Sequence, residues 1–212
     1  MNSTVTAYNK YADTYRRGVE KFWQQFPVDT PDAFCSILPG KRILNLGSGS
    51  GQDAVLLRKR GLDVLCLDGA PAMAKITEEL GFTSIVSTFE NMQFHEGEFD
   101  GVWAYTSLIH IPPLETAQIL HKLHHFLKPS GILAVGVVVG NREGVISDNF
   151  MPGAKRYIKD YSPSELRGLV TTANFKFEVE KHYLPEDLMQ VTDPDGSVRS
   201  YQEDYVTQIY SS

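Results

Sequence analysis

The chain has 212 residues, of which 42% are hydrophobic and 22% are charged, and its formal net charge at pH 7 is −6. These values are ordinary for one folded domain with a full core, and the acidic balance argues against a nucleic-acid partner, because phosphates attract basic surfaces. The N-terminus has no apolar stretch of the signal-peptide kind, and the most apolar segment, residues 131–140, is too short to span a bilayer, so we expect no membrane contact.

Short apolar runs alternate with amphipathic stretches from Arg42 onward. The first 35 residues are expected to form a helical segment that precedes this alternation. The pattern predicts strands over 42–46, 63–68, 83–88, 99–106 and 131–139 and helices over 51–61, 71–81 and 113–127. The tetrapeptide "KPSG", residues 128–131, is predicted to turn the chain into the fifth strand.

The last third of the chain is less regular. Residues 140–160 are mixed in charge and rich in turn formers, so we expect an irregular insertion there. A helix over 162–174 is predicted to begin with a capping box, in which Ser162 is the N-cap and Glu165 lies three residues on. Two strands, over 175–184 and 203–210, follow with the turn signal "DPDG" (193–196) between them.

Strands that alternate with helices indicate a parallel sheet wound by right-handed crossovers. The last two strands have no helix between them, so they are expected to pair antiparallel at one edge. The predicted fold class is therefore α/β. It is a doubly wound, Rossmann-like sheet, mostly parallel with an antiparallel C-terminal pair, with helices on both faces and with residues 1–212 in one domain.

A glycine-rich loop follows the first predicted strand, in the sequence "NLGSGSGQDA" (45–54), and an acidic residue, Asp68, ends the second strand. Glycines at every second position, Gly47, Gly49 and Gly51, let the backbone approach a ligand at the carboxyl ends of the strands. The pattern alone leaves two ligands open, the pyrophosphate of a dinucleotide or the methionine end of S-adenosylmethionine.

Several segments taken in order resemble class I S-adenosylmethionine-dependent methyltransferases. "ILNLGSGSGQDA" is similar to their first motif and "VLCLDGAPAM" to their second. "FENMQFHEGEFDGVWAYTSLIHIP" and "LHHFLKPSGILAVGV" resemble the segments around their fourth and fifth strands, and "YNKYADTY" is similar to a tyrosine-bearing helix that forms a lid in many members that act on small molecules. The resemblance implies that the first 35 residues are this lid and that the insertion 140–160 lies near the active site.

The resemblance also implies a set of residues that bind S-adenosylmethionine, with S-adenosylhomocysteine as the product. The family usually has an acidic residue where this chain has Asn45, and often an aspartate where it has Thr88. The implied cofactor-binding residues are Asn45, Gly47, Ser48, Gly49, Gly51, Asp68, Gly69, Met73, Thr88, Phe89, Glu90, Ala104, Tyr8, Tyr15 and Arg16.

His110 follows the fourth strand, where the family's active site opens, and it is the candidate general base or substrate-orienting group. The helical spacing of Tyr8, Tyr11 and Tyr15 places them on one face. Tyr11 is therefore a candidate substrate contact, as are Arg142 and Tyr157 in the insertion. We expect no metal site, because two cysteines, Cys35 and Cys66, make no ligand set and the histidines of the 113–127 helix lack an acidic partner motif.

The predicted function is methyl transfer from S-adenosylmethionine to an oxygen, nitrogen or sulfur atom of a small molecule, by direct in-line displacement. Two alternatives remain open, an NAD-dependent oxidoreductase and a non-catalytic S-adenosylmethionine-binding module. We expect a cytoplasmic protein that is a monomer or a homodimer and binds no nucleic acid.

Overall fold

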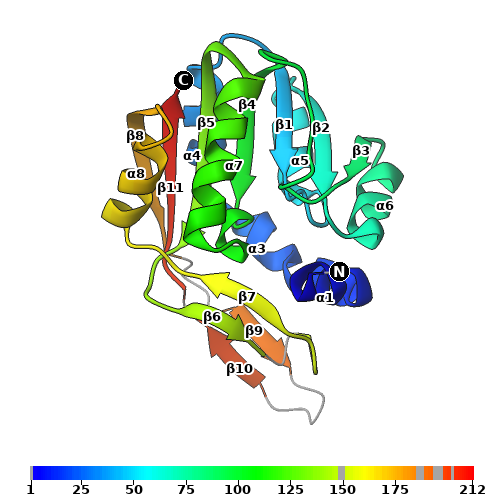
Figure 1. Cartoon of the computed structure of the whole chain (residues 1–212). Helices are drawn as coiled ribbons and strands as arrows, with labels where there is room; N and C mark the ends of the chain where they lie inside the picture. Colours follow the sequence, from blue (N-terminus) through cyan, green and yellow to red (C-terminus); the bar gives the residue numbers. More distant parts are fainter. Residues whose placement is uncertain (1, 148–150, 185–188, 193–197, 202) are drawn as a thin grey trace.

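A seven-stranded sheet with the strand order β3-β2-β1-β4-β5-β11-β8 forms the centre of the molecule (Figure 1). The structure, a computed structural model, describes residues 2–147, 151–184, 189–192, 198–201 and 203–212. The strands of this sheet are β1 (Arg42–Leu46), β2 (Asp63–Asp68), β3 (Thr83–Val86), β4 (Phe99–Tyr105), β5 (Leu127–Val138), β8 (Lys176–Tyr183) and β11 (Tyr205–Ser211). β1 to β5 are parallel, whereas β11 runs antiparallel to both β5 and β8. The predicted sheet with an antiparallel C-terminal pair is confirmed.

Helices cover both faces of the sheet, with α7 and α8 on one face and α4 and α5 on the other (Figure 1). The helices that follow the N-terminal segment are α4 (Asp29–Ser36), α5 (Gln52–Arg58), α6 (Pro71–Glu79), α7 (Pro113–Phe126) and α8 (Pro163–Thr171). A proline at the first helical position starts α6, α7 and α8. The predicted capping box of α8 is present, because Ser162 Oγ accepts from the Glu165 amide at 3.2 Å.

The N-terminal segment contributes three short helices, α1 (Ser3–Lys10), α2 (Ala12–Gly18) and α3 (Glu20–Gln25). Figure 1 shows α1 and α3 beyond the carboxyl ends of the parallel strands. The helix breaks at Tyr11, whose φ and ψ are −111° and 24°. Tyr8 and Tyr15 still meet, with ring centroids 5.2 Å apart, whereas Tyr11 contacts the Pro152 carbonyl, so the predicted shared face holds for two of the three tyrosines.

Two small hairpins also lie beyond the carboxyl ends of the strands (Figure 1). β6 (Glu143–Ile146) and β7 (Arg156–Lys159) pair antiparallel, so the prediction that residues 140–160 are irregular is wrong for these two segments. β9 (Met189–Thr192) and β10 (Val198–Tyr201) form a second antiparallel pair between β8 and β11. The predicted "DPDG" turn, residues 193–196, lies outside the described residues.

The start of β5 differs from the prediction of a turn over 128–131. Phe99 of β4 pairs with Leu127, whereas Gly101 pairs with Ile132, so the intervening residues of β5 form a bulge inside the strand. Ser130 adopts a positive φ of 63° within this bulge.

The fold has a crevice between β1 and β4. The chain leaves β1 toward β2 and β3 on one side and continues through β4 and β5 on the other, so strand order reverses between β1 and β4. Segments that follow β1, β2 and β4 therefore meet at this point, where ligands bind in open α/β sheets. A short 3-10 helix, η1 (Leu108–His110), follows β4 there.

Candidate active site

The glycine loop between β1 and α5 has a backbone that only glycine adopts without strain at its key positions. Gly47, Gly49 and Gly51 have φ angles of 71°, 49° and 76°. A Cβ atom at Gly47 would lie 2.5 Å from the Ser107 Cβ, and one at Gly51 would lie 2.8 Å from a methyl carbon of Thr77. The loop therefore packs closely against the end of β4 and against α6.

Asp68, the last residue of β2, holds the loop in place. Its Oδ2 accepts from the Gly49 amide at 2.9 Å, and its Oδ1 accepts from the Ala70 amide at 2.8 Å. Burial raises the pKa of Asp68 to about 6, although both backbone hydrogen bonds favour the ionised form. Each oxygen has one hydrogen bond from a backbone amide and retains a second lone pair for a ligand hydroxyl.

A cavity opens beside Asp68 and the glycine loop, and we call it the cofactor cavity. It is lined by Asn2, Thr4, Val5, Tyr8, Tyr15, Trp23, Gly47, Ser48, Gly49, Ser50, Gln52, Asp53, Asp68, Gly69, Thr88, Phe89, Glu90, Tyr105, Thr106, Ser107, His110 and Ile111. The carboxylates of Asp53, Asp68 and Glu90 are in this set, and no lysine or arginine among the described residues lines it. The cavity is therefore negatively charged.

Most of the residues that the sequence assigned to the cofactor lie at this cavity. They are Gly47, Ser48, Gly49, Asp68, Gly69, Thr88, Phe89, Glu90, Tyr8 and Tyr15, together with the candidate base His110. Tyr15 lies over the loop, because a Cβ at Gly49 would meet its ring at 3.4 Å.

Other predicted residues lie elsewhere. Gly51 caps α5, Met73 packs in a small cluster with Ala12, Ala70 and Ile76, and Ala104 is buried in the core. Arg16 is exposed and outside the lining, so no contact in the structure supports its predicted role in cofactor binding. Asn45 is fully buried beneath the loop, where its Nδ2 donates to Asp53 Oδ1 at 2.8 Å.

Sequence reasoning missed several lining residues, of which Asp53, Ser107 and Tyr105 are the most informative. Asp53 is only 4% exposed, and its pKa is raised to about 6 by burial. Ser107 Oγ and Tyr105 Oη are buried without a hydrogen-bond partner among the described residues. A signal for Asp53 was present, because an acidic residue directly after a glycine loop falls in the first turn of a helix.

A second cavity adjoins the first, and we call it the acceptor cavity. The two share Tyr8, Tyr15, Trp23, Thr106 and His110. The remaining walls of the acceptor cavity are mostly apolar, with Arg142, Arg156 and Glu203 as charged members, and they comprise Gly18, Val19, Phe22, Ile109, Val138, Arg142, Ile146, Arg156, Ile158, Glu203 and Tyr205.

A polar network crosses the boundary between the cavities. His110 Nδ1 lies 2.9 Å from the Tyr157 carbonyl oxygen, and Nε2 lies 2.8 Å from Tyr8 Oη. Because a carbonyl oxygen only accepts, Nδ1 carries the proton of the neutral ring and Nε2 accepts from the Tyr8 hydroxyl. Arg156 donates to the same phenol oxygen at 2.9 Å. An unprotonated imidazole nitrogen therefore faces a phenol that a guanidinium also contacts.

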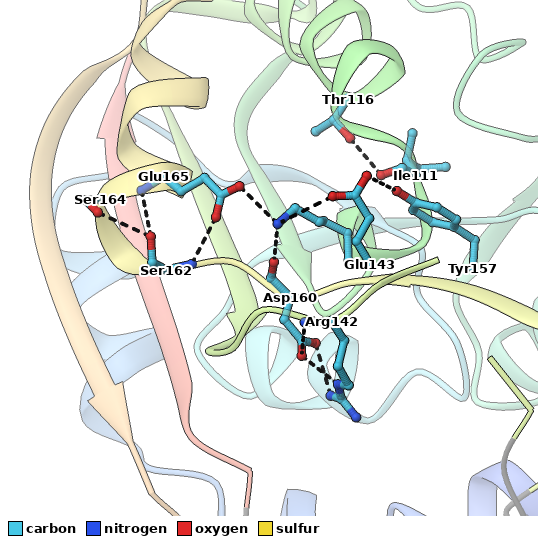
Figure 2. A network of polar contacts seen from close by, with 10 residues as sticks. Ile111, Thr116, Arg142, Glu143, Tyr157, Asp160, Ser162, Ser164 and Glu165 are labelled. Carbon is cyan, nitrogen blue, oxygen red and sulfur yellow. Dashed lines mark hydrogen bonds and ion pairs between the residues drawn. The ribbon is translucent and has the colours of Figure 1, made fainter. Parts of the chain in front are cut away.

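The three predicted substrate contacts are placed differently from one another. Arg142 lines the acceptor cavity and is held by Asp160, with nitrogen–oxygen distances of 2.6 and 3.0 Å (Figure 2). The Tyr157 hydroxyl donates to Glu143 (Figure 2). The Tyr157 backbone carbonyl contacts His110. Tyr11 donates to the Pro152 carbonyl, so neither tyrosine side chain lines a cavity.

Comparison with known proteins finds similarity to methyltransferases. Residues 44–135 match the family described as "Methyltransferase domain". An uncharacterized methyltransferase of Synechocystis sp. is 34% identical over 125 residues, which cover 58% of this chain and 57% of that protein. A ubiquinone biosynthesis O-methyltransferase of Xanthomonas campestris is 27% identical over 159 residues, which cover 66% of this chain and 65% of that protein. The chain thus spans less than two thirds of the length of these relatives.

Solved structures have the same fold. A Burkholderia thailandensis 1,6-didemethyltoxoflavin-N1-methyltransferase with bound 1,6-didemethyltoxoflavin and S-adenosylhomocysteine matches with a TM-score of 0.67 and 18% identity, over 96% of this chain and 86% of that one. Residues 44–135 thus match the methyltransferase domain family, and the chain shares the fold of this solved structure, which is the Rossmann-like fold that its sequence predicted.

The described residues contain neither a metal-binding cluster nor a membrane-spanning helix. No group of three or more histidine, cysteine or acidic side chains in this part of the chain is arranged to hold a metal ion. No helix within it has the length and apolar character needed to cross a bilayer.

Proposed function

We propose that the protein transfers the methyl group of S-adenosylmethionine to an oxygen, nitrogen or sulfur atom of a small molecule. The methyltransferase domain family and the named relatives support the reaction class. Two similar proteins support a small acceptor, since one is a ubiquinone biosynthesis O-methyltransferase and the other binds 1,6-didemethyltoxoflavin.

The charge around the glycine loop carries this proposal. A dinucleotide places its pyrophosphate at the N-terminus of the helix after the loop, where backbone amides and basic groups favour an anion. Here Asp53 is buried in the first turn of α5, and three acidic residues but no lysine or arginine among the described residues line the cavity. S-adenosylmethionine carries a sulfonium and an ammonium group, so this cavity suits it and disfavours NAD.

The residues around the cofactor cavity fit the parts of that ligand. Asp68 is placed to accept the ribose hydroxyls, and Thr88 and Phe89 stand near it for the adenine. We propose that α1 and α2 act as the lid and exclude water through Tyr8 and Tyr15. When bound, S-adenosylmethionine supplies an activated methyl group, so the protein's main task is alignment, which contributes up to roughly 7–11 kcal/mol.

The acceptor would enter the second cavity and present its nucleophile at the shared boundary. Direct in-line displacement forms the bond between acceptor and methyl carbon and breaks the bond between that carbon and sulfur, leaving a thioether. If the nucleophile carries a proton, Tyr8 and His110 Nε2 would accept it, because both residues line the boundary between the two cavities. We therefore assign His110 the role of general base, working through or beside Tyr8.

Calorimetric titration with S-adenosylhomocysteine, with NAD in parallel, tests the cofactor. We expect saturable binding of the thioether alone and weaker binding by Asp68→Ala. Binding of NAD alone would contradict the proposal. Transfer of a labelled methyl group to the small-molecule fraction of a cell extract, lost in Asp68→Ala, would then demonstrate catalysis, whereas binding without transfer would favour a non-catalytic binding module.

A further inference from the structure

Asp53 is a buried carboxylate that faces the cofactor cavity without a cation beside it. It is 4% exposed and lines the cavity. Its Oδ1 accepts from Asn45 Nδ2 and from the Ala54 amide, both at 2.8 Å. The Trp103 indole N–H lies close enough to favour the ionised form but makes no hydrogen bond of normal geometry, so Oδ2 has no full hydrogen bond from a described residue. No lysine, arginine or histidine of the described residues pairs with it. Burying a charge in this way is costly unless a partner of opposite sign arrives.

The neutral side chain of Asn45, at the end of β1, is compatible with an ionised Asp53 in α5. Its Nδ2 points at Asp53, and its Oδ1 has no partner among the described residues. A carboxylate at position 45 would lie within hydrogen-bond distance of Asp53, and two carboxylates that close cannot both stay ionised. The neutral amide is therefore matched to Asp53 and holds it in place.

The polar groups near Asp53 indicate a polar ligand at this end of the cavity. Ser48 Oγ and Ser107 Oγ line the cavity, are 4% and 5% exposed as residues, and have no hydrogen-bond partner among the described residues. Asp68 accepts a hydrogen bond from the Gly49 amide, and it is the residue assigned above to the ribose. The cavity thus has one carboxylate assigned to the ribose, and Asp53 lines it together with these two hydroxyls.

We propose that Asp53 binds the α-ammonium group in the methionine part of S-adenosylmethionine and that Asn45 positions it. This inference rests on the function proposed above. In this chain the negative charge that the family usually has at position 45 would instead be supplied by Asp53, eight residues later, in the first turn of α5. This role also makes Asp53 a residue that selects ligands with a free amino group.

Titration calorimetry at pH 7.5 tests this with two probes, S-adenosylhomocysteine and its deaminated analogue, which keeps the adenosine, the thioether and the carboxylate. The variant Asp53→Asn is nearly isosteric, because its Oδ1 retains both hydrogen bonds and its Nδ2 takes the place of Oδ2. We expect it to bind S-adenosylhomocysteine roughly 10- to 100-fold more weakly, the range for a charge-assisted hydrogen bond, and to bind the analogue with little change.

Controls separate the outcomes. Asp63→Asn, at an exposed site at the start of β2, should leave both affinities unchanged, and Asp68→Ala should weaken both. If Asp53→Asn weakens both probes equally or neither, the inference on Asp53 is wrong although the proposed function stands. If the unaltered protein binds neither probe, the proposed function fails and this inference fails with it. Thermal melting of Asp53→Asn verifies that the variant is folded.

Discussion

His110 is held in one tautomer by contacts to two different elements. The Tyr157 carbonyl in β7 accepts from Nδ1, which leaves Nε2 to accept the Tyr8 hydroxyl. Nitrogen NMR of the histidine rings at neutral pH should therefore show a protonated Nδ1 for His110, identified by its loss in His110→Gln. A resonance with the proton on Nε2 would contradict the arrangement.

The same geometry makes a kinetic prediction. If His110 takes the acceptor's proton, then His110→Gln should lower kcat about 10²- to 10⁴-fold, the usual contribution of general acid–base catalysis. The affinity for S-adenosylhomocysteine should change by less than about threefold, since the imidazole accepts a proton only during transfer. Calorimetry and initial rates measure the two effects separately, and an equal loss of both would show that His110 serves binding instead.

Asp53 should make the free protein less stable at neutral pH than at mildly acidic pH, relative to a neutral variant. Its pKa is raised to about 6 in the folded state by burial, although Asn45 and the Ala54 amide favour ionisation. Tyr15 and Asp68 face the same space, and Asp53 also raises the pKa of Tyr15. A raised folded pKa gives stability that is present below the unfolded pKa of about 4 and is lost as pH rises through about 6.

Urea denaturation therefore should show Asp53→Asn to be more stable than the unaltered protein above pH 7, by about 1–3 kcal/mol. The difference should shrink as the pH falls below 6 and approach zero near pH 3, where Asp53 is protonated in both the folded and the unfolded states. A constant difference across this range would mean that Asp53 does not titrate as its burial implies.

At the scale of elements, α8 and β7 are joined through one buried lysine. Lys159 is 6% exposed, and its Nζ lies 3.0 Å from Glu165 and 2.7 Å from the Asp160 carbonyl (Figure 2). Glu165 also completes the capping box of α8 with Ser162. Ser162→Ala should cost about 1 kcal/mol of unfolding free energy through the cap alone.

Glu165→Ala should cost more than Ser162→Ala, because it removes the cap contact and also leaves a buried ammonium group without its nearest carboxylate. Urea denaturation measures both, with Ser36→Ala as a control on an exposed helix end. Equal losses in the two variants would mean that the contact between Lys159 and Glu165 adds no stability.

The parallel strands and the glycine loop were predictable because their signals are local. "RILNL" and "DVLCLD" are apolar runs bounded by turn residues, and positive φ angles at Gly47 and Gly49 depend on the residue type itself. The β6–β7 hairpin was missed because β6 is short and alternates between exposed and half-buried residues, without the apolar run of a core strand.

In the candidate site too, residues with a local sequence signal were predictable, and residues that depend on contacts between elements were not. Asp68 was found because it ends a strand beside the glycine loop. The contact between Asn45 and Asp53 crosses the loop and depends on how α5 turns back onto β1, which no periodicity reports. The break at Tyr11 is similar, because it leaves Tyr8 and Tyr15 in ring contact while the Tyr11 hydroxyl donates to the Pro152 carbonyl, which the helical spacing does not indicate.

At the scale of the whole molecule, the net charge is −6, and the described lining of the cofactor cavity has three acidic residues and no lysine or arginine. S-adenosylmethionine carries one positive charge overall, S-adenosylhomocysteine is neutral overall, and NAD is anionic. At one ligand concentration and pH 7.5, the melting temperature should therefore rise most with S-adenosylmethionine, less with S-adenosylhomocysteine and not at all with NAD. A ligand at 100 times its Kd stabilises the folded state by about 2.7 kcal/mol, which corresponds to roughly 5–10 °C for a domain of this size.

Raising the salt concentration should reduce the difference in melting temperature between the S-adenosylmethionine and S-adenosylhomocysteine complexes, because screening weakens the attraction between the ligand's net positive charge and the carboxylates. An equal shift with NAD would show that the negative cavity does not select the ligand.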